Sequence, residues 1–425
     1  MRSLAIGFVL TMAAMPAYAG EPDGLVLPPG FHASIVAQGL GPFARHLAFR
    51  DKDRLYVSTE RQTKDAANAG IIALHLDGDH KVDRAEHFST IDNGTGIVFN
   101  NGALYAASAS TVYRFAFSGD ELVPSLPPET VIDGVPFRTP LVFDGKGGLF
   151  LAVGSGSNFC TPANSTEGIG PVSRLPKDYK PVGPNPCPAL AGRAGVWRFA
   201  ANRIGQKFLA GEHYASGIRD INALAWSPKS NALFGIMYGR DGTNKFWPEL
   251  VNAADDANVS DEMFRISKGT NMGWPYTYYD AARHMRLVSP EYGGNGQIAA
   301  KPDLYANPVV AFPAHVAPQD VVFYGGGQFP KAYRGGAFIA FHGAGGDIPD
   351  GHDNGYDVVF VPFDKNGVAG APQVFADGFA GPTKTDRNGT HAAYRPTGVA
   401  VGPDGALYVV DSQKGRIWRI SYGQN

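Results

Sequence analysis

The stretch Arg395-Pro-Thr-Gly-Val-Ala-Val-Gly-Pro-Asp-Gly-Ala-Leu-Tyr-Val-Val-Asp-Ser-Gln-Lys-Gly-Arg-Ile-Trp-Arg-Ile-Ser-Tyr422 decides the fold of this chain. It predicts three short strands, at 398–401, 406–410 and 416–422, separated by two tight turns. Pro-Asp-Gly at 403–405 suits the first turn, because proline presets φ, aspartate bonds the local backbone and glycine accepts a positive φ. The runs between the turns are rich in valine, isoleucine and aromatic residues, as β-strands are. One such meander cannot bury its own faces, so we expect further copies.

The opening phrase of that stretch, an apolar run often led by an arginine, recurs along the chain. Its six copies begin at Arg45, Thr95, Arg138, Arg219, Pro318 and Arg395. Each is soon followed by a second strand, such as Leu55-Tyr-Val-Ser or Leu149-Phe-Leu-Ala-Val. Six similar strand–turn–strand units predict an all-β chain folded as a six-bladed β-propeller. A β-sandwich is the alternative, although a sandwich does not need six similar phrases.

Composition and the N-terminal residues limit which classes of protein this chain can belong to. The chain has 425 residues, of which 44% are hydrophobic and 18% charged, and a formal net charge of −2, which gives no sign of nucleic-acid or anionic-membrane binding. Residues 1–19 resemble a secretory signal, with Arg2, an apolar run and a small-residue cleavage site at 17–19. No other stretch approaches bilayer-spanning length. We therefore expect a soluble periplasmic or secreted protein whose residues 20–425 form one propeller domain.

Cys160 and Cys187 bracket a segment dominated by proline, glycine, serine and asparagine. In an oxidising compartment this arrangement predicts a disulfide that pins a long loop, and two free buried thiols are the alternative. The sequence has no Cys-x-x-Cys-His, so it carries no covalent haem. The cysteine-bracketed loop and a second insertion, from Gly239 to about Pro313, are long enough to form one face of a site.

A strand at 31–38 precedes the first repeat. Propellers usually close by letting one terminus complete the blade begun by the other, so we expect this strand to pair with the sheet of 395–422. A free arm is the alternative. The chain also lacks a dinucleotide fingerprint, a phosphate-binding Gly-x-x-x-x-Gly-Lys and a nucleophile elbow in an α/β context.

Several phrases together resemble the soluble quinoprotein sugar dehydrogenases. The general matches are Gly217–Pro228, Ser260–Ile266 and Gly269–Tyr276. The matches to the sorbosone and pyranose dehydrogenase branch are Ala314–Pro318, Val322–Tyr324, Gln328–Ala337, Phe341–Gly343 and Gly355–Phe363. The likeness covers nearly all of the mature chain and keeps the order of the phrases.

This resemblance implies a six-bladed propeller that carries pyrroloquinoline quinone over calcium. It also implies an exported oxidoreductase that oxidises a sugar, or a related alcohol or aldehyde, by hydride transfer to the quinone. The electron acceptor would be a separate molecule, a cytochrome c or a quinone, since no haem domain is attached.

The resemblance also assigns roles to residues of this chain. Arg219 and Asp220 would stand beside the cofactor, and Arg138 and Arg395 occupy the corresponding entries of their own blades. Arginines in such places hold carboxylates and stabilise developing negative charge, although each could instead form a salt-bridged blade corner. His315 and His342 both match the family, so either could be the base, and His315 is the one that we assign as catalytic.

A contact between His342 and the cofactor is implied in the same way. Calcium would lie near Gly239, Arg240 and Asp241, held by main-chain oxygens and a carboxylate. Asp261 and Glu262 would hold a second, structural ion, or would cap the following turn.

Two departures from the family open an alternative function. Family members carry a histidine just before the third phrase, where this chain has Asp133-Gly-Val-Pro-Phe-Arg138. After His342-Gly343 the branch usually continues Ser-Trp-Asn-Arg, and this chain has Ala344-Gly-Gly-Asp347. His391 is a further candidate base without family support. The alternative is a propeller that has lost the dehydrogenase chemistry and acts as a ligand-binding module or a calcium-dependent lactonase or esterase.

A propeller brings equivalent ends of all its blades to one face around one axis. We therefore expect the candidate residues to converge on the mouth of the central channel. They are Arg219, Asp220, His315, His342 and Arg395.

Overall fold

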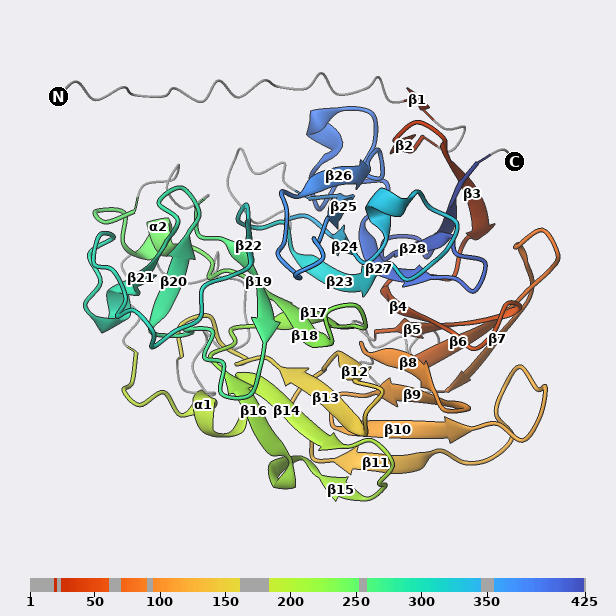
Figure 1. Cartoon of the computed structure of the whole chain (residues 1–425), viewed down its shortest axis with the longest axis horizontal. Coiled ribbons are helices and arrows are strands. Elements are labelled where there is room, and N and C mark those ends of the chain that lie inside the picture. The colour runs from red at the N-terminus through yellow and green to blue at the C-terminus, as the bar shows by residue number, and fades with distance from the viewer. Residues whose placement is uncertain are drawn as a thin grey trace.

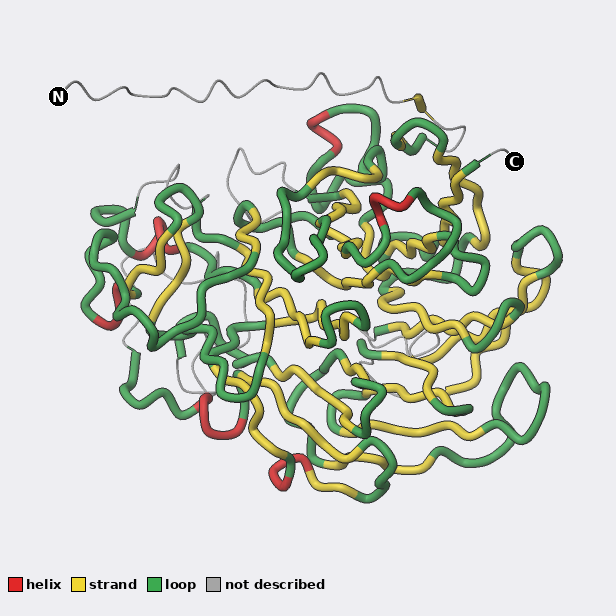
Figure 2. The backbone as a smooth tube through the Cα atoms, viewed as in Figure 1, coloured by secondary structure: helices red, strands yellow, loops and turns green. Residues whose placement is uncertain are grey.

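The computed structural model describes residues 19–20, 24–60, 70–89, 95–160, 183–251, 258–344 and 355–423. In these residues six β-sheets surround one axis, as Figure 1 and the strands of Figure 2 show. The predicted six-bladed β-propeller is therefore confirmed. The predicted signal segment lies almost wholly outside the described residues.

Each copy of the repeated phrase forms or leads into the innermost strand of a blade. In chain order the innermost strands are β4 (Ala44–Phe49), β8 (Ile97–Asn100), β12 (Leu141–Phe143), β17 (Ile221–Ser227), β23 (Pro318–Phe323) and β27 (Pro396–Val401). The second strands are β5 (Arg54–Thr59), β9 (Ala103–Ala107), β13 (Gly148–Val153), β18 (Ala232–Met237), β24 (Ala337–Phe341) and β28 (Leu407–Asp411). Most residues of these second strands are buried, because each strand is covered by a neighbouring blade on both faces.

The outer strands complete the sheets. The third strands are β6 (Gly70–Leu76), β10 (Thr111–Ala116), β14 (Gly195–Ala200), β19 (Asp261–Ile266), β25 (Asp357–Val361) and β29 (Ile417–Tyr422). The fourth strands are β7 (Val82–Ser89), β11 (Glu129–Asp133), β16 (Glu212–Ser216), β22 (Val310–Phe312), β26 (Gln373–Ala376) and β3 (Phe31–Ala37). β15 (Gln206–Lys207) adds a short parallel strand to β11.

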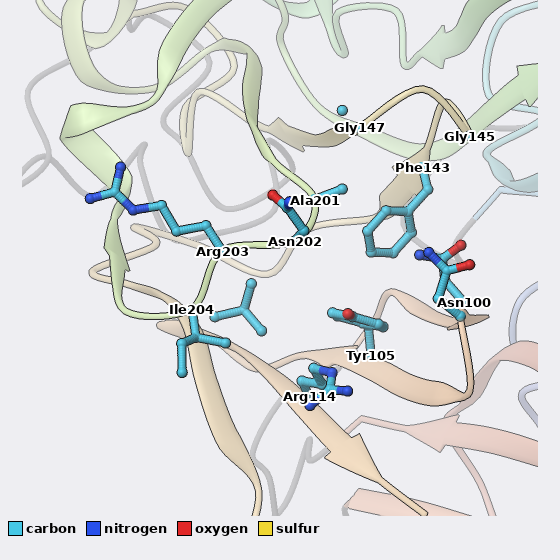
Figure 3. Close-up of a pocket in the computed structure, with 13 residues that line it drawn as sticks. Asn100, Tyr105, Arg114, Phe143, Gly145, Gly147, Ala201, Asn202, Arg203 and Ile204 are labelled. Carbon is cyan, nitrogen blue, oxygen red and sulfur yellow. The ribbon is translucent and has the colours of Figure 1, made fainter.

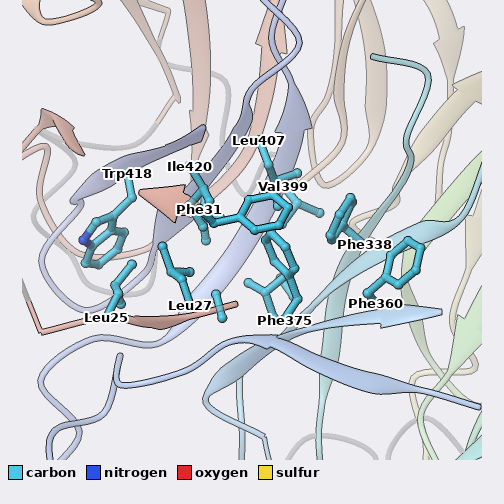
Figure 4. Packing of buried hydrophobic residues seen from close by; sticks show 14 of the residues in the cluster. Leu25, Leu27, Phe31, Phe338, Phe360, Phe375, Val399, Leu407, Trp418 and Ile420 are labelled. Atoms are coloured by element: carbon cyan, nitrogen blue, oxygen red, sulfur yellow. The ribbon is translucent and has the colours of Figure 1, made fainter. Parts of the chain in front are cut away.

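The ring closes between the two ends of the sequence, as predicted. β3 pairs antiparallel with β29, with Phe31 opposite Tyr422 and Ala37 opposite Ile417. Phe31 is buried at this seam and makes edge-to-face contacts with aromatic rings of the fifth and sixth blades (Figure 4). The seam thus covers the edge of β29 and packs the last blade against its neighbour.

The prediction that the residues from Gly239 to about Pro313 form an insertion is partly wrong. Its β19 and β22 are the third and fourth strands of the fourth blade. β19 begins with two charged residues, Asp261 and Glu262, so the sequence did not predict a strand there. The strand is nevertheless buried, except at Arg265. Outside the blade this region forms α2 (Thr243–Phe246) and a hairpin. The strands of the hairpin are β20 (Thr277–Asp280) and β21 (Met285–Val288).

The remaining elements are short. Cys160 and Cys187 form the predicted disulfide, and residues 161–182 of the loop between them lie outside the described part. α1 (Ala189–Gly192) follows the second cysteine, and β2 (Val26–Leu27) pairs with β1 (Ala19–Gly20) before the first blade. The 3₁₀ turns are Phe208–Ala210, Pro290–Tyr292, Lys331–Tyr333 and Lys384–Asp386. Among the described residues, no helix has the length and apolar character needed to cross a bilayer.

A β-bulge recurs at the start of the innermost strand in four blades. The register shifts fall between Ala44 and Leu47 in β4, and between Ile221 and Ala223 in β17. The same shift occurs after Pro318 in β23 and after Pro396 in β27. A bulge leaves one residue out of the strand pairing and changes the direction in which its side chain points. These bulges therefore present extra side chains at one end of the axis.

We predict that Phe31 stabilises the seam. Phe31→Ala should lower the free energy of unfolding by about 3–5 kcal/mol, because a buried aromatic side chain is removed and a cavity remains. Urea unfolding followed by tryptophan fluorescence measures this, with the exposed Val368→Ala as control. Equal unfolding midpoints for the two variants would contradict the prediction.

Candidate active site

The bulged residues meet at the centre of the ring and build the floor of a polar mouth. The side-chain oxygen of Gln319 accepts hydrogen bonds from Asn222 at 3.1 Å and from Arg45 at 3.5 Å. Its main-chain oxygen lies 3.0 Å from Nε2 of His46. These residues come from β4, β17 and β23, so three blades are joined across the axis by polar contacts.

Arg219 is held at the mouth by three acceptors. It donates from Nε to Oδ1 of Asn158 at 2.8 Å and from Nη1 to the carbonyl oxygen of Gly239 at 2.7 Å. Its Nη2 forms an ion pair with Asp241. With every donor group directed at an oxygen, the guanidinium plane has a fixed orientation.

Asp241 joins Arg219 to His315. Its Oδ1 lies 3.3 Å from Nδ1 of His315, while Oδ2 accepts from Arg219. Burial acts to raise the pKa of Asp241, but Arg219 and His315 outweigh it and lower the pKa to about 2. This carboxylate is therefore ionised at neutral pH and favours the tautomer of His315 that carries its proton on Nδ1.

The backbone around His315 is strained and firmly held. His315 has φ 65° and Ala317 has φ 52°, a region that non-glycine residues seldom adopt. The N–H of Ala317 donates to Oδ2 of Asp261 at 3.0 Å, and the N–H of Gly239 donates to Oδ1 at 2.7 Å. Buried Asp261 thus links the His315 segment to the Gly239 turn. A strained backbone persists only where surrounding contacts fix it, and these two hydrogen bonds are such contacts.

Asp220 lies against the third blade, where a Cβ added at Gly154 would be 2.6 Å from its Oδ1, and its charge acts on two arginines of that blade. Burial opposes the charge on Arg138, but Glu60 and Asp220 outweigh it and raise the pKa of Arg138. Glu60 in turn forms ion pairs with both Arg138 and Arg45. Asp220 acts in the same direction on Arg193, although burial is the larger effect and lowers the pKa of that group.

Arg395 and His342 form the remaining side of the mouth. Arg395 donates to the carbonyl oxygens of His342, Gly343 and Ala344 at 3.1, 2.6 and 3.1 Å, and it forms no ion pair within the described residues. Burial, together with Arg395 and Arg45, lowers the pKa of His342 well below its usual value. His342 is therefore a neutral imidazole at pH 7, with Nε2 2.8 Å from Oγ of Ser412.

The structure thus connects most of the predicted site residues through short contacts. Arg219, Asp241 and His315 form one group, Arg395 and His342 a second, and Asp220 faces Arg138. Arg240 and Glu262 point elsewhere, into buried ion pairs with Glu291 and Arg286. His391 is exposed beside Asp386, away from these contacts.

The side chains alone do not form a metal cage. Among the described side chains, no three His, Cys, Asp or Glu residues lie together in a way that would hold a metal ion. Main-chain oxygens are the other source of ligands, and they crowd the Gly239 turn. A Cβ added at Gly239 would lie 2.5 Å from the carbonyl oxygen of Ser260 and 2.7 Å from that of Val259. Only glycine fits there.

Sequence reasoning missed several residues of the mouth, among them Arg45, Glu60 and Asn158. Arg45 was open to detection, because it begins the first copy of the phrase as Arg138, Arg219 and Arg395 begin later copies. Asn158 has no such signal. It accepts from Arg219 and from the N–H of Asp241 at 3.0 Å, and it donates from Nδ2 to the carbonyl oxygen of Asp241 at 2.8 Å.

We predict that Asn158 positions Arg219. Asn158→Ala should destabilise the protein by roughly 1–3 kcal/mol for each donor left without an acceptor. Asn158→Asp keeps the acceptor for Arg219 and should recover part of that loss. Urea unfolding measures the effect, with Asn366→Ala, an exposed turn residue, as control. An Asn158→Ala variant as stable as the control would refute the positioning role.

We predict a pH-dependent contribution from Asp261. Burial raises its pKa to about 6, and Asp241 adds to the effect, while the bonds from Gly239 and Ala317 and the nearby His315 oppose it. Between about pH 4 and pH 6 the folded protein holds a proton that the unfolded chain has released. The stability from Asp261 therefore rises as the pH falls through 6, by about 3 kcal/mol at pH 4.

Urea unfolding at pH 7, 5.5 and 4 tests this. The difference between wild type and Asp261→Asn should shift in favour of wild type as the pH falls. The fully exposed Asp120 provides the control, because Asp120→Asn should give a flat difference. A flat difference for Asp261→Asn as well would contradict the prediction.

Comparison with known proteins places this geometry in a family. The TrAA12-like family model matches residues 187–423. The calcium structure of a Trichoderma reesei Carbohydrate-Active Enzymes Family AA12 protein is similar, with a TM-score of 0.71 at 18% identity over 94% of this chain and 97% of that one. The holo form of the pyranose dehydrogenase PQQ domain from Coprinopsis cinerea gives a TM-score of 0.69 at 16% identity, over 97% and 99% of the two chains. At these identities the likeness shows the fold alone.

A curated relative is closer in sequence. Aldose sugar dehydrogenase YliI of Escherichia coli is 26% identical over 290 residues, which are 68% of this chain and 60% of that protein. This chain therefore spans less than two thirds of that relative's length. Together these matches confirm the resemblance to the soluble quinoprotein sugar dehydrogenases. With its family model covering more than half of the sequence, the chain belongs to the TrAA12-like family.

Proposed function

We propose that this protein is an exported oxidoreductase that oxidises a sugar, or a related alcohol or aldehyde, with pyrroloquinoline quinone and calcium at the mouth of the propeller. The observation that carries the proposal is the surplus of guanidinium groups there. Five arginines face three carboxylates through the contacts described above. The arginines are Arg45, Arg138, Arg193, Arg219 and Arg395, and the carboxylates are Glu60, Asp220 and Asp241.

Several of these donors are left without acceptors. The Nε atoms of Arg45 and Arg138 are buried and have no hydrogen-bond partner in the described part of the chain. Within the described residues Arg395 donates to carbonyl oxygens but to no carboxylate, and its guanidinium lies 5.4 Å from the centroid of the Tyr356 ring. Buried donors without acceptors are costly, so a ligand with several carboxylates suits this mouth. Pyrroloquinoline quinone is such a ligand, and when bound it supplies the hydride acceptor.

His315 is the residue best suited to take the proton from the substrate hydroxyl. The paired Asp241 favours a proton on Nδ1 and leaves Nε2 as the basic nitrogen. His342 is a neutral imidazole that lies half-buried against Ser412 and Arg395, which suits it to a contact with the cofactor. In this assignment His315 takes the role of the family histidine that the chain lacks before Arg138.

Arg219 has two tasks in this arrangement. It keeps Asp241 ionised, which holds His315 in one tautomer. Its charge also faces the mouth, where negative charge on the reacting oxygen would be stabilised. The negative charge of Asp220 partly offsets the positive charges of Arg138 and Arg193.

Calcium would be held at the Gly239 turn. The main-chain oxygens that crowd this turn and the carboxylate of Asp241 are the hard ligands that calcium prefers. The side chains of Glu262 and Arg240 point away from this turn, into buried ion pairs with Arg286 and Glu291, so we leave them out of this site. Export is supported by the N-terminal segment and by the disulfide.

We predict that the mouth binds the quinone through Arg395. Calorimetric titration with pyrroloquinoline quinone and calcium should give binding to wild type, and Arg395→Ala should bind about 30- to 1000-fold more weakly, since a charge-assisted contact contributes roughly 2–4 kcal/mol. The control is Arg84→Ala on β7, whose side chain is exposed. Chelation of calcium should weaken the binding of wild type.

The same proteins separate binding from chemistry. His315→Gln should still take up the quinone but should lose dye-linked oxidation of sugars. If wild type takes up no quinone at all, the dehydrogenase proposal fails and a ligand-binding propeller replaces it. Equal uptake by wild type and Arg395→Ala would show that the cofactor lies elsewhere.

A further inference from the structure

A cavity lies at the opposite end of the blades from the mouth. It has a volume of about 540 Å³ and lies between the second and third blades (Figure 3). Its walls come from the β8–β9 turn, the β12–β13 turn and the segment that follows β14. Arg138 precedes β12 at the mouth, whereas Gly145 and Gly147 follow β12 in the cavity wall. One innermost strand therefore connects two separate sites.

Aromatic rings form one wall of the cavity. Tyr105 and Phe143 contact each other edge to face, with ring centroids 4.8 Å apart. Ile204 stands across from them in Figure 3 and is 53% exposed. Aromatic and aliphatic groups in a concave surface bury the C–H faces of a ligand.

Three asparagines supply the polar part of the wall: Asn100, Asn101 and Asn202. None of their side-chain amides makes a hydrogen bond with the residues that the structure describes. Each amide offers two donors and an acceptor with two lone pairs. Such groups match hydroxyls, which both donate and accept, better than they match ions.

The charges of the cavity are nearly balanced. Arg114 is neutralised by an ion pair with Glu129, which also raises its pKa. Arg203 forms no ion pair within the described part of the chain. One exposed guanidinium is a weak attraction for anions in water, because solvent screens it. The ligand that suits this wall is therefore neutral and rich in hydroxyl groups.

The rim of the cavity is open. A Cβ added at Gly145 or Gly147 would meet no atom within 4 Å, so nothing in the described residues closes this side. The volume lies within the range of about 300–1,000 Å³ typical of ligand sites. An open cavity of this size accepts a few units of a longer chain.

We propose that this cavity binds a neutral carbohydrate chain, through stacking on Tyr105 and Phe143 and hydrogen bonds to Asn100, Asn101 and Asn202. The proposal is independent of the chemistry at the mouth. Such a site would hold a polysaccharide on one face of the propeller while the other face stays open to small substrates.

Calorimetry or affinity electrophoresis with neutral gluco-oligosaccharides tests this, and oligogalacturonate serves as the charged comparison. The double variant Asn202→Ala/Arg203→Ala and the single variant Phe143→Leu should each bind neutral oligosaccharide at least tenfold more weakly than wild type. The matched control is Lys365→Ala/Asn366→Ala, which changes the equivalent exposed turn of the fifth blade and should bind like wild type.

Two further measurements complete the design. Unchanged melting temperatures of the turn variants would show that the fold is intact. Arg395→Ala should keep its oligosaccharide binding, so that failure at the mouth and failure at this cavity remain distinguishable. No binding of any neutral oligosaccharide, binding of oligogalacturonate alone, or binding that the double variant leaves unchanged would each overturn the proposal.

Discussion

Closure of the ring is the constraint on which the rest of the structure depends. The mouth takes Arg45 from the first blade, Arg219 from the fourth and Arg395 from the sixth. The sixth blade lies beside the first because β3 pairs with β29 and because Thr397 donates to the carbonyl oxygen of Ala44. The buried aromatic contacts of Phe31 hold this seam. The polar site therefore rests on apolar packing at the periphery.

The bulges explain how one scaffold carries both a regular core and an irregular site. Within the blades, alternating side chains pack against neighbouring sheets. At the start of β4, β17, β23 and β27 the register slips, and residues such as Asn222 and Gln319 turn toward the axis. Changes at these positions alter the chemistry of the mouth while the packing of the blades is kept.

Local signals in the sequence predicted the blades, because turn residues and apolar runs act over a few neighbours. The same signals failed at β19, where buried Asp261 and Glu262 have partners far along the chain. Propeller geometry led to the expectation that Arg219, His315 and Arg395 share one face, whereas their individual partners could not be predicted in this way. Asn158 and Glu60 lie in loops whose positions depend on tertiary contacts, so no spacing in the sequence pointed to them.

The seam between β3 and β29 also has a consequence for assembly. Its two strands lie near opposite ends of the sequence, and contacts so distant in sequence form slowly because a long loop must close first. Until then the sixth blade keeps an open edge along β29, and β3 is a strand without a sheet. Two incomplete chains can satisfy both edges by exchanging β3, which yields a domain-swapped pair. The strand that completes the ring is thus also the element that two copies can exchange.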